Sequence, residues 1–272
     1  KEIMNNGYKK WIEENLSIVN KEGVLVPFKL NPVQDKYLTQ DTSNRKDIIL
    51  KARQQGFSSL ILAIFTADFL VRENVYNVVV ADNTDNAQGL LKRVKDYLRC
   101  IDPNIEKALK YNSKYEMYLE RYNNTYKIGT AENINFGRSK TITNLHLSEA
   151  FFYPHLQDIL AGALQALVPT GKAIIETTAN GFNEGKELWD RSVLGESGFK
   201  PLFYNAEDFY SKSFLEEKKK ELGERLYKQE YPGNPTEAFI TSGQCFFDTE
   251  SLARYLKEAK EPMKEGIYVQ TI

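Results

Sequence analysis

The sequence predicts an α/β fold, with a mainly parallel β-sheet covered by helices on both faces. Short, continuously apolar runs alternate along the chain with apolar or amphipathic segments of helical length. Polar residues do not alternate within these runs, as they would in strands with one face in water, so both faces of each strand are expected to be buried. This alternation of strands and helices is typical of a parallel sheet between two helical layers.

The composition indicates an ordinary globular protein and excludes several classes. The chain has 272 residues, enough for one large or two small domains, and its net charge of -1 lacks the basic surplus typical of nucleic-acid binders. Any DNA contact must then be a local patch or be shared by several copies. The two cysteines, Cys100 and Cys245, argue for a reducing compartment and against a disulfide framework or a zinc site. No apolar run approaches the roughly 20 residues of a membrane span, and the polar start is unlike a secretory signal, so a soluble intracellular protein is expected.

The core elements follow in order. Residues 1–30 are predicted to form a polar helix anchored by Ile3, Trp11 and Leu16, and then an extended arm. Next come a buried strand, an apolar helix capped at its start by a serine, a second strand and an amphipathic helix, at residues 47–50, 58–71, 76–81 and 83–99. A hairpin that turns at Asn123 and Asn124, a third strand, a helix and a fourth strand are predicted at residues 115–130, 142–150, 156–167 and 172–180.

The character of the sequence changes at about Phe199, where short helices and a strand or two are expected. Four regions result: an N-terminal helix and arm, a core, a lid subdomain and a linker, at residues 1–30, 31–198, 199–250 and 251–272. The lysine run at residues 218–220 is expected to be a solvated helix face. The chain ends in "GIYVQTI", which resembles the opening of another strand, so the linker is expected to lead toward a further domain.

The stretch "ILKARQQGFSS", residues 49–59, has the pattern of a phosphate-binding loop. Gly56 stands where the chain must turn tightly before a helix, and the N-terminus of that helix favours an anion. Ser58 stands where such a loop carries the hydroxyl that reaches Mg²⁺, but Phe57 occupies the position of the usual lysine. Lys51 or Arg53 can supply the missing charge; Arg53 lies inside the loop, and its guanidinium can grip phosphate with two hydrogen bonds. The alternative is an ordinary serine-capped helix.

Polar groups at the ends of later strands support the phosphate-loop interpretation. Ser148 and Glu149 end an apolar strand, where an acidic pair in ATPases of this build holds the metal-bound water and activates the attacking water. Thr177, Thr178 and Asn180 end the next strand and suit the sensing of a terminal phosphate. The alternatives are that Glu149 only caps a helix and that the second group is an ordinary polar loop.

Three other polar residues carry weaker signals. Gln34 precedes the first core strand, where an amide can read an adenine edge. His146 lies in the middle of a strand and is expected to be a core residue, and His155 is expected to stand at the entry to a helix. No Ser–His–Asp or metal-ligand spacing is present, so nucleophilic hydrolysis has no support from the sequence.

An ordered set of motifs resembles the large terminase subunit of tailed bacteriophages. The resemblance extends over almost the whole chain, from about Leu30 to Asp248, in "LNPVQ", "KARQQGFSS", "VVVADNTDNAQGLL", "LHLSEAFF", "ETTANGFNEGKELWDRS" and "EYPGNPTEAFITSGQCFFD". It implies the N-terminal ATPase domain, with a P-loop NTPase core of the ASCE type and a small lid. The C-terminal nuclease domain of that family has no counterpart in this sequence.

The resemblance also implies a role for each motif. Arg53 becomes the phosphate-binding cation and Glu149 the catalytic carboxylate, while Ser148, in place of the commoner Asp, can touch Mg²⁺ only through water. Arg138 matches an arginine finger that acts on a neighbouring subunit, with Arg121 and Lys140 as nearby alternatives. The coupling motif consists of Thr177, Thr178, Ala179 and Asn180. The nucleotide-binding residues are Gln34, Lys51, Arg53, Gln54, Gln55, Gly56, Phe57, Ser58 and Ser59.

The function implied is ATP hydrolysis with Mg²⁺ to drive double-stranded DNA into a procapsid. The expected partners are the viral DNA, the portal protein and the small terminase subunit, in a homo-oligomeric ring that forms at the portal vertex in the host cytoplasm, the isolated domain being a monomer. A non-hydrolysing nucleotide-binding scaffold is one alternative, because Phe57 and Ser148 suit a degenerate site; the presence of Glu149 beside Ser58 favours the enzyme. A helicase-like translocase is another, although no aromatic wedge for strand separation is evident.

Overall fold

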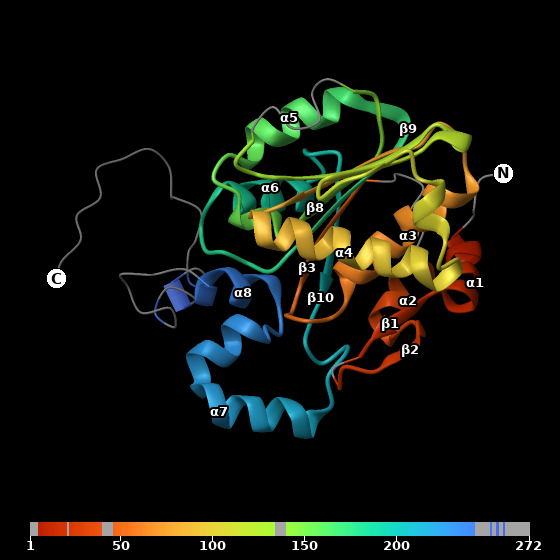
Figure 1. Ribbon diagram of the computed structural model, residues 1–272. Helices are drawn as coiled ribbons and strands as arrows, with labels where there is room; N and C mark the ends of the chain where they lie inside the picture. The colour runs from red at the N-terminus through yellow and green to blue at the C-terminus, as the bar shows by residue number, and fades with distance from the viewer. Residues whose placement is uncertain are drawn as a thin grey trace, which may run out of the picture.

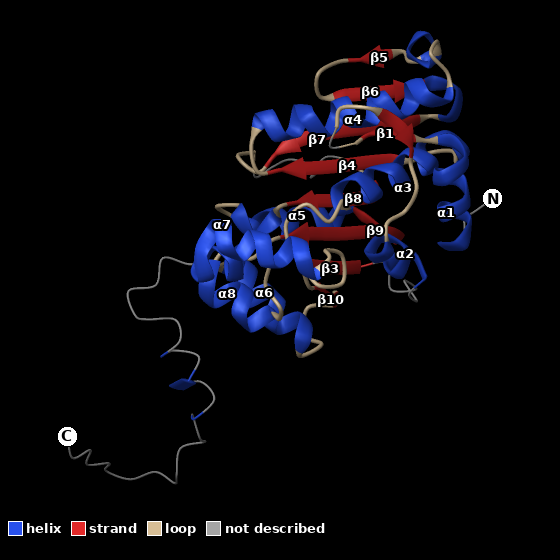
Figure 2. Cartoon of the chain, turned by 90° about the horizontal axis from the view of Figure 1, so that it is seen from below, coloured by secondary structure: helices blue, strands red, loops and turns tan. Residues whose placement is uncertain are grey.

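The computed structural model describes residues 5–20, 22–39, 46–133 and 140–242, together with residues 251, 254, 255 and 258. Within these residues, a sheet of eight strands forms the centre of the molecule (Figure 2). From one edge to the other it contains β10 (Lys200–Tyr204), β3 (Lys46–Lys51), β9 (Leu167–Thr177), β8 (Ile142–Ser148), β4 (Tyr76–Ala81), β7 (Asn124–Thr130), β6 (Glu116–Leu119) and β5 (Tyr111–Asn112). The strands from β10 to β7 are parallel, and β6 and β5 add an antiparallel edge. The predicted mainly parallel sheet is confirmed.

Helices cover both faces of the sheet (Figure 1). The helices are α1 (Asn5–Asn15), α2 (Pro32–Thr39), α3 (Phe57–Val71), α4 (Thr84–Ile101), α5 (Leu156–Ala166), α6 (Glu184–Val193), α7 (Lys212–Glu230) and α8 (Pro235–Ser242), with single 3₁₀ turns η1 (Ile105–Ala108), η2 (Glu120–Tyr122) and η3 (Ala150–Phe152). Alternate residues of β3 enter different cores: Ile49 packs in the cluster with α1 to α4, and Ile48 and Leu50 pack in the cluster with α5, α6 and α8. The continuous apolar strands of the sequence therefore follow from burial on both faces.

The carboxyl ends of three central strands, β3, β9 and β8, lie side by side at one end of the sheet. Leu50 of β3 is paired with Thr177 of β9, and Ser148 of β8 is paired with Glu176 of β9. The polar groups that follow these strands in sequence are consequently neighbours in space. Ligands of open α/β sheets bind at the carboxyl ends of the strands.

Four predictions of local structure are corrected. Residues 200–204, expected in the smaller subdomain, form β10, which pairs with β3 at the edge of the central sheet. β9 begins at Leu167 instead of residue 172, because the chain enters the strand directly from α5. Asn124 is already part of β7, so the hairpin turn runs through η2 to Asn123. The cap of α3 is Gly56, which has no side chain to cap the helix; Ser58 lies inside the first turn, and its hydroxyl donates to Glu176.

Two helices of the region predicted as a lid, α7 and α8, lie beyond the carboxyl ends of the parallel strands and are called the lid helices below. Figure 2 shows α7 and α8 on the side toward which the arrows of these strands point. Aromatic rings pack together around the two ends of α7: Tyr210 stacks on Phe214 with centroids 4.5 Å apart, and Tyr231 packs edge-on against both. These rings pack against a small cluster of Ala52, Ala206 and Leu215, in which Ala52, just after β3, joins them to the core. The lid helices are thereby fixed beside the loop that follows β3.

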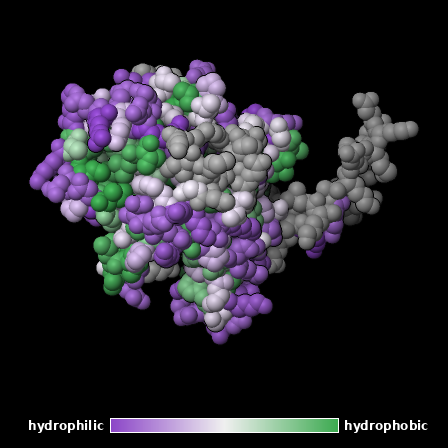
Figure 3. Space-filling view, turned by 90° about the vertical axis from the view of Figure 1, so that its right-hand side faces the viewer, coloured by the Kyte–Doolittle hydropathy of each residue, from purple (hydrophilic) through white to green (hydrophobic). Residues whose placement is uncertain are grey.

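The surface combines polar areas with exposed apolar side chains. The face in Figure 3 is largely hydrophilic, with separate apolar patches. The hairpin of β1 (Ser17–Val19) and β2 (Leu25–Pro27) exposes three apolar side chains, Val19, Val24 and Leu25. Among the described residues, none of the helices has the length and hydropathy that crossing a membrane requires.

Candidate functional site

The loop between β3 and α3 turns tightly just before the helix begins. Gln54 and Gly56 have positive φ angles of 57° and 81°, a conformation that glycine adopts without strain. Two side chains hold the loop backbone: Asn31 Nδ2 donates to the carbonyl of Gln55 at 3.0 Å, and Gln34 Nε2 donates to the carbonyl of Gly56 at 2.8 Å. The first N–H groups of α3 have no partner within the helix, so the loop presents donors and a positive helix end to an anion.

Phe57, at the position of the usual lysine, is a core residue. Its side chain is 1% exposed and packs edge-on against Tyr37, with ring centroids 5.9 Å apart, and against Tyr204 at 4.7 Å. The ring fixes the start of α3 against α2 and β10. Phe57 therefore contributes only its backbone to the phosphate-type loop, and the charge must come from another residue.

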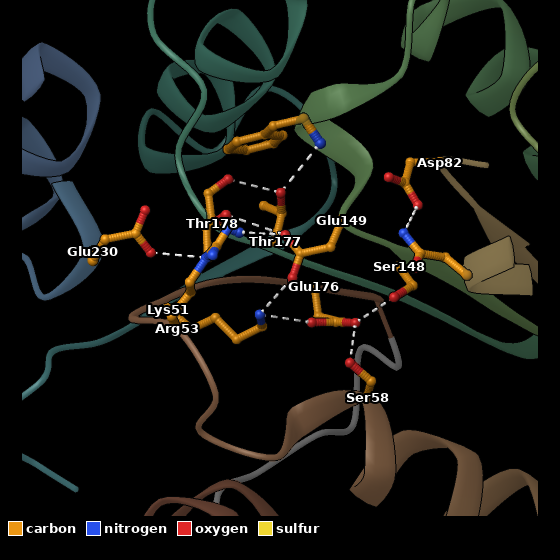
Figure 4. Close-up of polar contacts among 12 residues, drawn as sticks. Lys51, Arg53, Ser58, Asp82, Ser148, Glu149, Glu176, Thr177, Thr178 and Glu230 are labelled. Atoms are coloured by element: carbon orange, nitrogen blue, oxygen red, sulfur yellow. Dashed lines mark hydrogen bonds and ion pairs between the residues drawn. The ribbon is translucent and has the colours of Figure 1, made fainter. Parts of the chain in front are cut away.

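Lys51, the last residue of β3, brings a buried positive charge to the site (Figure 4). Its side chain is 5% exposed, and Nζ lies 2.8 Å from Glu149 Oε1 and 3.1 Å from Glu176 Oε2. Burial alone would lower the pKa of Lys51, but the charges of Glu149 and Glu176 outweigh burial and raise the pKa above its ordinary value. The ammonium group is thus held charged between two carboxylates.

Glu149 is held at the tip of β8 by contacts to both of its carboxylate oxygens. Oε1 pairs with Lys51, and Oε2 accepts hydrogen bonds from Thr178 N at 3.0 Å and Thr178 Oγ1 at 3.2 Å. The backbone at Glu149 has a positive φ of 54°, which is rare outside glycine and is found at functional sites. The side chain is 32% exposed, so this oriented carboxylate remains accessible to water.

Glu176, near the end of β9, is the residue that the sequence interpretation missed. It is fully buried, and its Oε1 accepts hydrogen bonds from Ser58 Oγ and Ser148 Oγ, both at 2.7 Å. His146 Nε2 lies 3.5 Å from the same oxygen, and His146 is buried as predicted. Burial alone would raise the pKa of Glu176, but the charge of Lys51 and the hydrogen bonds lower the pKa below its ordinary value. An acidic residue directly after the apolar run "AII" of a predicted buried strand was the available signal.

Arg53 lies against the lid helices. Its side chain is 63% exposed, with Nε 2.8 Å from Glu230 Oε2 at the end of α7. The backbone N–H of Arg53 donates to the carbonyl of Glu230 at 3.2 Å, and Tyr210 OH donates to the backbone carbonyl of Arg53 at 2.9 Å. The structure thus brings Lys51 to the two carboxylates and joins Arg53 to α7. The role of Arg53 toward a phosphate stays a prediction.

The predicted coupling motif connects β9 to the segment after Glu149. Thr177 Oγ1 accepts from the N–H of Phe151 at 3.2 Å and donates to the carbonyl of Thr178 at 2.8 Å. Asn180 Nδ2 donates to the carbonyl of Phe151 at 3.1 Å. Ala179 is buried and packs in the core beneath them. A shift of Glu149 would be transmitted directly to the end of β9 through these bonds.

The other predicted residues lie at the loop or in other elements of the fold. Gln34 is 3% exposed and bonded at both ends of its amide, to Asn31 and Gly56, so it supports the loop, and its predicted contact with adenine stays a prediction. Gln55 is buried and donates to the carbonyl of Asn205, and Ser59 Oγ accepts from Arg93. Arg138 lies outside the described residues. Lys140 precedes β8 at the end opposite Glu149, and Arg121 lies in η2.

The chemistry of these residues fits a nucleoside triphosphate with Mg²⁺. Mg²⁺ in such sites is bound by one or two carboxylates or hydroxyls and by substrate phosphates, not by a cage of protein ligands. The described residues contain no cluster of three or more His, Cys, Asp or Glu suited to a metal. Ser58, Ser148 and Glu176 could supply oxygen ligands, and the N-terminus of α3 with a nearby cation, Lys51 or Arg53, could supply positive charge for phosphate.

Replacing Gly56 by alanine is expected to disturb the loop. An added Cβ would lie 2.8 Å from Gln34 Nε2, on a residue whose φ is +81°. We expect the free energy of unfolding in urea to fall by about 1–3 kcal/mol, and nucleotide affinity to fall with it. Gly23→Ala is the matched control, because Gly23 has φ +78° and no atom within 4 Å of an added Cβ. Equal losses of stability and unchanged nucleotide affinity in both variants would contradict this account of the loop.

Comparison with known proteins identifies the fold. No protein-family model matches the chain. The large terminase ATPase domain of Thermus phage P74-26 is similar, with a TM-score of 0.58 and 16% identity over 75% of this chain and 93% of that one. The HK97 bacteriophage large terminase has a TM-score of 0.65 and 16% identity, over 85% of this chain and 54% of that one. The large terminase of a thermophilic bacteriophage, in complex with ADP, has a TM-score of 0.53 and 12% identity, over 72% of this chain and 50% of that one. The chain has the fold of phage large terminase ATPase domains and spans about half of the two longer proteins.

Proposed function

We propose that this chain is the ATPase domain of a viral large terminase, which hydrolyses ATP to move double-stranded DNA into a procapsid. The observation that carries the proposal is the position of Glu149: an accessible carboxylate fixed at the tip of β8, next to a phosphate-type loop at the tip of β3. The shared fold and the ADP complex of the thermophilic phage protein support the assignment.

Each residue of the site has a part in this reaction. Glu149 orients the attacking water and accepts its proton, a role for which one carboxylate oxygen is anchored by Thr178 and the side chain remains accessible. The loop N–H groups and a cation hold the phosphates, and bound Mg²⁺ supplies charge neutralisation for phosphoryl transfer. Thr178 bonds to Glu149, so the state of the carboxylate is coupled to the end of β9.

We propose that either Lys51 or Arg53 is the cation that binds the phosphates. The ion pair between Arg53 and Glu230 provides a separate test for Arg53. Arg53 is paired with Glu230 through Nε. If Arg53 is the phosphate cation, Arg53→Ala weakens ATP binding about tenfold or more, the loss expected for a charge-assisted hydrogen bond. Glu230→Ala breaks the same ion pair from the other side and is expected to preserve ATP affinity. Equal losses in both variants would show that only the ion pair matters.

The decisive experiment is a steady-state ATPase assay of the wild type, with and without Mg²⁺, portal protein and DNA. Turnover that depends on Mg²⁺ and rises with portal and DNA supports the motor. Absence of turnover under all of these conditions, with ATP binding intact, supports the non-hydrolysing scaffold; strand separation of duplex DNA supports a helicase-like translocase.

The assembly and its partners are also proposed. Each subunit of a ring shares the DNA with its neighbours, so a net charge of -1 per chain is compatible with DNA translocation. We propose a homo-oligomeric ring that binds the portal protein and the small terminase subunit at the procapsid vertex in the host cytoplasm. The isolated domain is expected to sediment as a monomer.

A further inference from the structure

Glu176 occupies the place of an acidic residue that β8 lacks. We propose, on the basis of the proposed ATPase function, that Glu176 is the carboxylate on the Mg²⁺ side of the site and that it replaces the Asp usual at position 148. The carboxylate would thus come from β9, while the strand that normally provides it ends in Ser148.

The first support is the contact between Glu176 and the phosphate-type loop. In P-loop NTPases the metal is held by the loop Ser or Thr together with an acidic residue from a strand tip. Ser58 is that loop serine by position, and its Oγ donates to Glu176 Oε1 at 2.7 Å. The same oxygen accepts from Ser148 Oγ, also at 2.7 Å. The hydroxyl of the loop and the hydroxyl at the tip of β8 therefore both donate to the same oxygen atom of the Glu176 carboxylate.

The second support is the register of the two strands. Ser148 and Glu176 are paired residues of the parallel neighbours β8 and β9. Paired residues in adjacent strands project on the same face of a sheet about 5 Å apart. A glutamate has one methylene more than an aspartate, so from β9 it reaches the position that an aspartate on β8 would occupy.

The third support is the charge held at a buried position. Glu176 is fully buried, and a buried carboxylate is costly unless it is paired and hydrogen-bonded. Lys51 compensates the charge at Oε2, while the contacts on the Oε1 side are two neutral hydroxyls and His146. Glu149 lies on the other side of Lys51 and bonds to Thr178. The two carboxylates are therefore separated into a water-facing one and a metal-facing one.

The first test is Glu176→Gln, which preserves size and an acceptor oxygen but removes the charge. ATP binding is measured by calorimetry with Mg²⁺ and, separately, with EDTA, together with the thermal stabilisation that each gives. The ratio of the affinity with Mg²⁺ to the affinity with EDTA is expected to fall about 10–100-fold relative to the wild type. This is the loss typical when a carboxylate that supports a metal is removed. Asp47→Asn is the matched control, since Asp47 is a buried carboxylate on β3 bonded to Tyr37 OH at the other end of the strand. Its Mg²⁺ effect is expected to equal that of the wild type.

The second test moves the carboxylate back to β8. The double variant Ser148→Asp/Glu176→Gln is expected to regain the Mg²⁺ dependence of ATP binding to within a few fold of the wild type. Ser148→Asp alone places a second carboxylate beside Glu176, so without metal it is expected to have a lower Tm than the wild type and a larger gain of Tm from Mg²⁺. The recovery in the double variant does not follow if Glu176 only neutralises Lys51, because Glu176→Gln would then lose no Mg²⁺ dependence to restore.

The results separate this inference from the proposed function. Wild-type Mg²⁺ dependence in a folded Glu176→Gln variant overturns the inference and leaves the ATPase assignment standing. If that variant does not fold, the double variant decides, and a folded double variant without Mg²⁺ dependence overturns the inference. A wild type that binds no ATP with or without Mg²⁺ overturns the proposed function and, with it, the inference.

Discussion

Glu149→Gln is expected to lower kcat for ATP hydrolysis by about 10²–10⁴-fold, the range for loss of a general base, while ATP affinity changes little. The amide has the shape of the carboxylate and keeps an oxygen that can accept from Thr178 N and Oγ1. It cannot take a proton from water at neutral pH. Steady-state kinetics give kcat, and titration with a non-hydrolysable analogue gives the affinity.

The control for this variant is Glu184→Gln on α6. Glu184 also accepts a backbone N–H, from Gln157 at 3.0 Å, but it lies outside the cluster. Its variant is expected to hydrolyse ATP at the wild-type rate. A Glu149→Gln variant with wild-type kcat would show that Glu149 is not the general base and serves only to hold Lys51 and Thr178.

The fold was predictable because its signal is local. Both faces of the central strands are buried, so each strand appears in the sequence as a short apolar run, and each helix has its own periodicity. The membership of β10 was not predictable, since it depends on pairing with β3, about 150 residues earlier. Residues 200–204 have only intermediate burial apart from Tyr204, as expected for an edge strand, and resemble a separate short element.

The site was partly predictable for a similar reason. Parallel strands bring the residues after their carboxyl ends together, and in the structure Glu176 and Lys51 link Ser58 to Glu149 and Thr178. Sequence spacing could not show which of two cations, two positions apart, enters the cluster. That choice depends on Glu230, 177 positions after Arg53 in the lid helices. Glu176 was missed because it lies inside an apolar strand and has no partner near it in sequence.

Lys51→Met is expected to lower the free energy of unfolding at neutral pH by about 3–5 kcal/mol, the usual cost of removing one partner of a buried ion pair. Methionine fills the space of the lysine stem, so the loss comes from charge. Glu176 would remain fully buried without the ammonium group that lies 3.1 Å away in the wild type. The measurement is urea denaturation of the wild type and the variant at pH 7.5 and at pH 5.

The pH dependence of this loss follows from the direction of the pKa shift. In the wild type, Lys51 and the hydrogen bonds lower the pKa of Glu176, so the carboxylate contributes stability above its unfolded pKa and this is lost only as pH falls through the folded pKa. Without Lys51, burial dominates and raises the pKa of Glu176 above the unfolded value. The folded variant then binds a proton more tightly than the unfolded chain, and its deficit relative to the wild type shrinks between pH 7.5 and pH 5.

The double variant Lys51→Met/Glu176→Gln distinguishes the charge from the packing. It removes the unpaired carboxylate, so it is expected to recover most of the stability lost in Lys51→Met and to lose the extra pH dependence. A double variant as unstable as the single one at pH 7.5 would mean that the lysine stem, rather than its charge, stabilises the end of β3. In that case the cluster of Lys51, Glu149 and Glu176 would not be the electrostatic unit on which the assignment of two different carboxylate roles depends.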